Sequence, residues 1–208
     1  MAYRPKILAF AGSLRKDSFN KKLVKIAIKG AEEAGAKVTY IDLKDYPLPL
    51  YDQEIEDAQG LPENAIKLKK LMWENDGFLI SCPEYNSSMP AVFKNVIDWT
   101  SRNASADEVY LSCFIDKVVA LTSASPGQLG GLRGLVHVRA MFGNINSLVL
   151  PQQKSISSAN KAFNEKGELI DAKQQAEVMK IGANLAQFLI KHKSADNVPA
   201  RSKEKILT

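Results

Sequence analysis

Apolar and polar residues follow two different periods along this chain, and the two periods alternate from one end to the other. Five short runs have the pattern of strands: residues 37–43 alternate, and residues 77–83 are almost wholly apolar, as in a central parallel strand covered on both faces. Between them lie longer segments in which apolar residues recur every three or four positions, as in amphipathic helices. The predicted strands are 6–12, 37–43, 77–83, 117–125 and 147–151, and the predicted helices are 18–35, 62–75, 90–102, 131–142 and 171–193.

This strict alternation predicts an α/β fold, a doubly wound five-stranded parallel sheet with helices on both faces. We expect residues 1–193 to form a single domain and the polar, basic residues 194–208 to form a flexible tail. Residues 47–61 and 103–116 follow neither period. They are therefore expected to be irregular loops over one edge of the ligand site.

Composition and charge exclude several classes of protein. The chain is 45% hydrophobic and 25% charged, as in an ordinary globular protein. Its net charge of +5 comes from lysines scattered over predicted helices, so nucleic-acid binding is not expected. No run approaches the ~20 apolar residues of a membrane span, and the N-terminus lacks the features of a signal peptide. Because Cys82 and Cys113 belong to no metal or CxxC motif, we expect reduced thiols in a cytoplasmic protein.

Ligands of such sheets bind outside the carboxyl ends of the strands, and three loops there carry suggestive residues. In the first, residues 12–20, Gly12 allows a tight turn close to a ligand. Ser13 and Ser18 supply hydroxyl groups and Arg15 a fork of charged donors, while Ser18 is also a good helix N-cap. Free amides and the helix dipole favour an anion at such a helix start, so this loop predicts a monophosphate site. A capped helix after a polar turn, with Arg15 on the surface, would explain the same residues.

The second loop, residues 83–90, follows the third predicted strand. Pro83 ends the strand, Tyr85 offers a flat surface for a ring, and Asn86 offers hydrogen bonds to the edge of a heterocycle. A plain turn with a buried tyrosine is an equally good explanation of this loop alone.

The third loop, residues 123–131, has three glycines within five residues, Gly127, Gly130 and Gly131. A backbone that passes close under a flat group requires such residues, although a flexible loop would contain them too. Because the three loops follow strands one, three and four, together they predict one flat, anionic ligand.

Motifs for other chemistry are absent from the sequence. There is no GxGxxG for a dinucleotide and no GxxxxGK[ST] for a triphosphate. His137 and His192 both fall in predicted helices, and neither a Ser/His/Asp order nor a metal-ligand spacing is present. We therefore expect no catalytic side chain and no metal, and chemistry that a bound cofactor supplies.

At these loops the chain resembles the NADPH-dependent FMN reductase family, which includes bacterial quinone, azo-dye and chromate reductases. The resemblance rests on Gly12-Ser13-Leu14-Arg15 with Ser18 and Asn20, then Pro83-Glu84-Tyr85-Asn86 with Pro90, then Gly127 and Gly130-Gly131. It spans about residues 6–152, with the motifs in the expected order. The family has a flavodoxin-like sheet of strand order 2-1-3-4-5.

The resemblance implies bound FMN, with NADPH or NADH as the hydride donor and a small acceptor such as a quinone, free flavin, azo compound or metal oxyanion. It assigns the phosphate to Ser13, Arg15, Ser18 and Asn20. It assigns the flavin ring to three further groups of residues, which are Pro83, Glu84, Tyr85 and Asn86, then Ser123, then Gly127, Gly130 and Gly131. A flavodoxin-like electron carrier is the alternative, although such carriers are strongly acidic and this chain is not. A flavin-bound regulatory module would need a partner surface, for which only the tail is available.

Two predicted helices carry more apolar residues than one packed stripe needs. They are helix 90–102, with Val92, Phe93, Val96, Ile97 and Trp99, and helix 131–142, with Leu132, Leu135, Val136, Val138 and Met141. Such surfaces predict a homodimer, or a homotetramer made of two dimers, with ligand sites near the interface. Complete burial of both helices within one chain would explain the same pattern.

Overall fold

A five-stranded parallel sheet forms the centre of the molecule, in the order β2-β1-β3-β4-β5. The computed structural model describes residues 3–196, without the side chains of 194–196. The strands are β1 (Lys6–Ala11), β2 (Lys37–Tyr40), β3 (Gly77–Ser81), β4 (Val118–Ala124) and β5 (Leu148–Ile156). The predicted fold class and strand order are confirmed. The apolar runs of β3 and β4 are buried along their whole length because they lie in the middle of the sheet.

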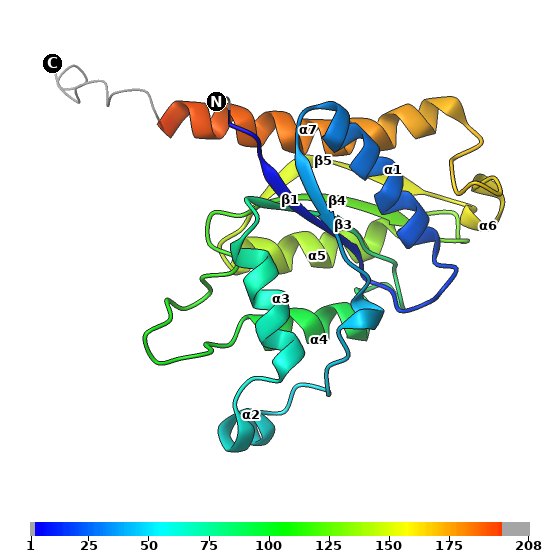
Figure 1. Ribbon diagram of the computed structural model, residues 1–208. Coiled ribbons are helices and arrows are strands. Elements are labelled where there is room, and N and C mark those ends of the chain that lie inside the picture. The colour runs from blue at the N-terminus through cyan, green and yellow to red at the C-terminus, as the bar shows by residue number, and fades with distance from the viewer. Residues whose placement is uncertain (1–2, 197–208) are drawn as a thin grey trace, which may run out of the picture.

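Helices cover both faces of the sheet (Figure 1). On one face lie α1 (Phe19–Glu33) and the long α7 (Ala172–Asp196), drawn in blue and orange. On the other lie α3 (Glu63–Trp73), α4 (Ala91–Thr100) and α5 (Leu132–Asn144). Each face has its own apolar core, and the alternation of side chains along the strands divides the buried residues between them.

Strand β5 forms one edge of the sheet and is longer than predicted, because Pro151 does not end it. The pairing of β4 with β5 is irregular, because its register shifts between Val119 and Leu121. Pro151 lies within this irregular stretch, between the paired residues Val149 and Gln153, a position where the missing N–H of proline is tolerated. Beside it, the Arg139 guanidinium of α5 donates a hydrogen bond of 2.7 Å to the Leu150 carbonyl.

Residues 47–61 were predicted to be an irregular loop at the ligand site, and both parts of this prediction are wrong. The segment contains α2 (Gln53–Gln59), whose first turn is capped by the carboxylate of Asp52. It also packs on the outer side of α4, where the Pro49 carbonyl accepts hydrogen bonds of 2.8 Å from Asn95 and from the Trp99 indole. Helix α2 was missed because it is short and follows two prolines, and its residues show no helical period of apolar positions.

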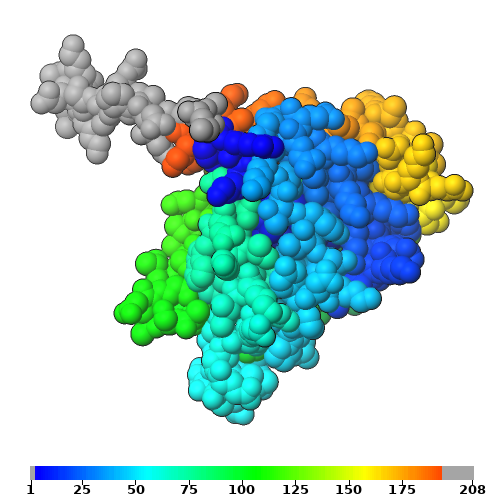
Figure 2. All heavy atoms as spheres, viewed as in Figure 1, coloured from blue at the N-terminus to red at the C-terminus, as the bar shows by residue number. Residues whose placement is uncertain are grey.

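Residues 103–116 are irregular as predicted, but they lie at the wrong end of the sheet for the ligand site. They lead into the amino end of β4 and appear as the green loop at lower left, far from the dark blue loop after β1 (Figure 2). The ammonium group of Lys69, 1% exposed, holds the segment through an ion pair of 2.6 Å with Glu108. Within this segment, three side chains are buried in the core, those of Leu111, Cys113 and Phe114.

Two short elements were not predicted, the 3-10 helix η1 (Leu43–Asp45) and α6 (Ala159–Ala162). Helix α7 runs to Asp196, and the rest of the predicted tail lies outside the described residues. Both cysteines are buried and free. Within residues 3–196, no helix is long and apolar enough to cross a membrane.

Candidate functional site

The loop between β1 and α1, residues 12–18, forms the first wall of the candidate site. The Gly12 amide continues the sheet by donating to the Ser81 carbonyl at 3.0 Å. The Ser13 hydroxyl accepts from the Arg15 amide at 3.3 Å, and the Ser18 hydroxyl caps α1 by accepting from the Lys21 amide at 3.4 Å. The amides that begin α1 have no acceptor within the helix, so the helix start presents free N–H groups and a positive dipole end to the loop.

Asn20, in the first turn of α1, uses most of its side-chain hydrogen bonds within the protein. Its buried side-chain oxygen accepts from the Ser81 hydroxyl at 2.8 Å and from the Ala124 amide at 3.0 Å. Its amide nitrogen donates to the Ala124 carbonyl at 2.9 Å. Asn20 therefore fastens the start of α1 to the ends of β3 and β4, and only one N–H of its side chain is left for a ligand.

The loop after β3 is a tight hairpin that displays Tyr85. The amide of Tyr85 donates to the Ser88 carbonyl at 2.9 Å and the amide of Ser88 donates back at 3.0 Å. Asn86 and Ser87 between them both have positive φ, 51° and 65°, as in a type I′ turn. Their own N–H groups take no part in the two bonds that close the turn, and the Tyr85 side chain is 49% exposed. The hairpin thus offers a ring surface beside two backbone donors.

Glu84 ties this hairpin to the start of α5. One carboxylate oxygen accepts from Arg133 Nε at 2.9 Å, and the other accepts from the Gly134 amide at 3.1 Å. Burial of the carboxylate favours its neutral form, but these hydrogen bonds and the Arg133 charge outweigh burial and hold the pKa of Glu84 below its usual value. Because its charge is matched in this way, Glu84 does not repel an anion from the neighbouring loop.

The glycine-rich loop after β4 is shaped by two glycines and one serine. The Ser123 hydroxyl is fully buried and donates to the Gly130 carbonyl at 2.7 Å. Gly131 has a φ of +92°, and a Cβ there would lie 2.9 Å from the Ser123 hydroxyl oxygen. Gly127 differs, since a Cβ there would meet nothing closer than 3.7 Å. Gly130 and Gly131 are thus required by the folding of the loop itself, and Gly127 is free of that constraint.

These loops enclose a small cleft of about 50 Å³ at the carboxyl edge of the sheet. The predicted site residues that line it are Ser13, Arg15, Ser18, Asn20, Pro83, Glu84 and Tyr85. Those that support the walls without lining the cleft are Asn86, Ser123, Gly127, Gly130 and Gly131. Lining residues absent from the prediction are Phe19, Ala124, Ser125 and Pro126. Their signal in the sequence was position alone, since all four lie within the predicted loops 12–20 and 123–131.

The donors at the cleft suit an anion such as a phosphate group. At about 50 Å³ the cleft is much smaller than the ~150 Å³ of a cavity that holds a benzene molecule, so a larger ring system does not fit inside it. Hydroxyl groups, the Arg15 guanidinium and the start of α1 provide the donors. A flat group joined to the anion would have to lie outside, over the hairpin with Pro83 and Tyr85. The donor set therefore fits a ligand with a phosphate at one end and a planar ring at the other.

The apolar residues of α4 do not form the exposed surface that the sequence suggested. Phe93, Val96, Ile97 and Trp99 are buried within the chain, because residues 47–51 cover the outer side of the helix. Helix α5 does keep exposed apolar side chains next to the cleft, with Leu132 40% and Val136 60% exposed.

Comparisons with known proteins point to one family. The model of the NADPH-dependent FMN reductase family matches residues 5–161. The chain is 34% identical over 170 residues to an NAD(P)H-dependent FMN reductase of Pseudomonas aeruginosa, covering 81% of this chain and 86% of that protein. It is 31% identical over 177 residues to a quinone reductase of Escherichia coli strain K12, covering 82% and 88%. Among solved structures, FerB of Paracoccus denitrificans, a flavoenzyme NAD(P)H:(acceptor) oxidoreductase, superposes with a TM-score of 0.71 at 26% identity, covering 90% of this chain and 98% of FerB.

Proposed function

This chain belongs to the NADPH-dependent FMN reductase family, and we propose that it is an FMN-dependent oxidoreductase that uses NAD(P)H to reduce quinones. Bound FMN supplies a centre that takes up hydride from a nicotinamide and gives the electrons to a second molecule at the same place. The observation that carries the proposal is the cleft at the carboxyl edge of the sheet, since hydroxyl groups, the Arg15 guanidinium and the start of α1 gather there as donors for the phosphate of FMN.

The residues of the β1–α1 loop hold the phosphate in this proposal. Ser13 and Ser18 contribute hydroxyl groups, Arg15 contributes charge, and the free amides at the start of α1 complete the set. The main role of Asn20 is structural, because its side chain fixes the start of α1 to the ends of β3 and β4.

The hairpin after β3 positions the flavin ring. Pro83 and Tyr85 provide the surface beside it, and the backbone N–H groups of Asn86 and Ser87 are free to donate to its polar edge. The Glu84 carboxylate and the Gly130–Gly131 turn keep the hairpin and the start of α5 in one rigid arrangement. The exposed side of the hairpin leaves room for a nicotinamide and then for an acceptor.

Substitution of Arg15 tests the assignment of the phosphate. Arg15→Ala should weaken FMN binding by ~1.5–3 kcal/mol, the range for hydrogen bonds to charged groups, and leave riboflavin binding nearly unchanged. Equal affinity of wild type and variant for FMN would show that Arg15 is only a surface residue.

Enzyme function is tested separately, by mixing the FMN-loaded protein with NADPH and, in a parallel experiment, with NADH. Rapid bleaching of the flavin, followed by reoxidation on addition of a quinone, is expected with at least one of the two donors. A flavin that stays oxidised with both would favour an electron carrier.

The assembly that we propose is a homodimer, or a homotetramer of two dimers, formed through the exposed face of α5. Leu132, Val136 and the neighbouring Leu129 are apolar and exposed beside the cleft, where a partner subunit would shield the flavin ring from water. We also propose a cytoplasmic location, which suits two buried, free thiols. Light scattering at assay dilution, run beside an activity measurement, tests the assembly. A fully active monomer of 22.9 kDa would contradict it.

A further inference from the structure

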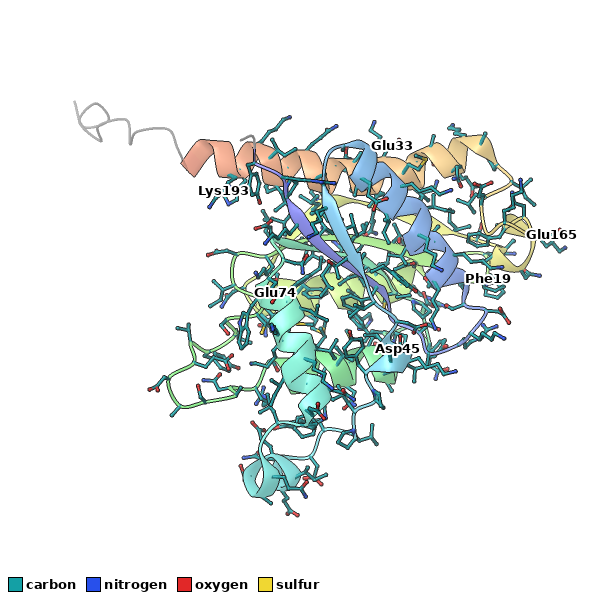
Figure 3. All side chains as sticks on the ribbon, in the orientation of Figure 1. Phe19, Glu33, Asp45, Glu74, Glu165 and Lys193 are labelled. Atoms are coloured by element: carbon teal, nitrogen blue, oxygen red, sulfur yellow. The ribbon has the colours of Figure 1, made fainter. Side chains whose placement is uncertain are left out.

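A second hairpin, residues 159–170, lies against the start of α1 beside the anion cleft. It follows β5 and is closed by antiparallel pairing of Phe163 with Leu169 and by the hydrogen bond from the Asn164 amide to the Glu168 carbonyl at 2.9 Å. Figure 3 labels Phe19, at the start of α1, and Glu165 on the neighbouring hairpin at the right of the molecule. We call residues 159–170 the outer hairpin.

Aromatic and cationic side chains connect the outer hairpin to the cleft. The rings of Phe163 and Phe19 are stacked, with centroids 6.0 Å apart and planes inclined by 7°. The Arg15 guanidinium lies over the Phe19 ring at 5.9 Å, and the Lys22 ammonium group lies over the Phe163 ring at the same distance. Arg15 and Phe19 both line the cleft, so the contact with Phe163 lies directly behind the cleft wall.

Arg15 needs such support because little else holds its side chain. It is exposed, and an exposed arginine loses side-chain entropy when it is held in one geometry. Contact with an aromatic ring restricts the guanidinium before a ligand binds, so less side-chain entropy is lost on binding. Phe19 can do this only if its own ring is fixed, and the parallel ring of Phe163 fixes it.

The outer hairpin is itself firmly attached to the body of the protein. Leu169 is 5% exposed and packs in the core beneath α1 and α7. Its amide donates to the side-chain oxygen of Gln175 at 2.9 Å, and Glu168 forms an ion pair of 3.1 Å with Lys29 of α1. Phe163 is therefore carried by a fixed element and can act as a support.

We propose that Phe163 is a positioning residue for the phosphate of FMN, acting through Phe19 to hold Arg15 at the cleft. The inference rests on the proposed function and adds a residue that lies beyond the matched region of the family model, which ends at residue 161. It makes the outer hairpin a determinant of the preference for FMN over the phosphate-free flavin.

Flavin titrations of the apoprotein test this role, with FMN and riboflavin measured side by side by fluorescence quenching. Phe163→Leu keeps apolar volume but removes the ring, and should weaken FMN binding about threefold to tenfold while riboflavin binding changes less than about twofold. Phe163→Tyr keeps the ring and should restore FMN binding. Phe188→Leu is the matched control, since Phe188 is a half-buried ring of α7 that contacts His192.

A double-variant cycle tests whether the effect of Phe163 on FMN binding passes through Arg15. In an Arg15→Ala background, Phe163→Leu should no longer affect FMN binding, because its effect passes through Arg15. The inference is overturned if Phe163→Leu weakens both flavins equally, leaves FMN binding unchanged, or acts undiminished without Arg15. Those results leave the proposed function intact, whereas a wild-type protein that binds neither flavin would overturn both.

Discussion

Removal of the Asn20 side chain separates a structural role from a direct contact with the ligand. Asn20→Ala deletes three buried hydrogen bonds, with the Ser81 hydroxyl, the Ala124 amide and the Ala124 carbonyl. These bonds join the start of α1 to the ends of the two central strands. We expect the variant to lose stability even when no flavin is present.

The magnitude follows from the partners that the substitution leaves behind. Each buried polar group without a partner costs ~1–3 kcal/mol, and three groups in one network do not add fully. The expected loss is therefore about 3–4 kcal/mol in the free energy of unfolding. For a chain of 208 residues this lowers the melting temperature by about 10 °C.

Urea unfolding of the apoprotein measures this loss, and flavin titration of the same preparation measures binding. Asn144→Ala is the matched control, because Asn144 is exposed at the end of α5 and its substitution should change stability by less than ~0.5 kcal/mol. If apo Asn20→Ala unfolds like the wild type while its affinity for FMN alone falls, the side chain is a ligand group and the structural argument is refuted.

Further variants test other parts of the site. Glu84→Gln should cost about 1–2 kcal/mol at pH 7, with the exposed Arg133 limiting the effect. Urea unfolding should show this difference disappear as the pH falls through the lowered pKa of Glu84, because stability from a carboxyl of lowered pKa is lost when it is protonated. Equal acid sensitivity of the two proteins would contradict this. Gly131→Ala should lower the melting temperature by several degrees through a strained φ and a steric clash, whereas Gly127→Ala should leave it unchanged or slightly raised. Ser18→Ala should cost ~1 kcal/mol of stability by removing the cap of α1, and an unaltered urea midpoint would show that the cap contributes nothing.

The strands and the long helices were predictable because the information is local, whereas the strand order came from the family resemblance. Each strand is a short apolar or alternating run, each long helix carries a stripe, and the connections between parallel strands are right-handed. Pro151 misled the prediction of β5, since a proline in an edge strand at an irregularity does not end the strand. The exposed helix α2 was missed because none of its residues is buried, so it has no apolar stripe.

The three loops of the site were also predictable, but the roles of individual residues within them were not. Asn20 and Ala124 are 104 positions apart, so no local pattern shows that the amide is used inside the protein. The pairing of Glu84 with Arg133 likewise depends on how α5 begins beside the β3 hairpin. The burial of α4 depends on the residues around Pro49, which were predicted to form a loop at the ligand site.

The edges of the sheet restrict how this protein can associate with other chains. On β5, Pro151 has no N–H to offer, and the Leu150 carbonyl is already occupied by Arg139. The opposite edge, β2, has only four residues. A further strand would lose pairing at Leu150 and Pro151 on one edge and would meet only a short strand on the other. Both features disfavour the addition of a strand from another chain and the aggregation that follows from it.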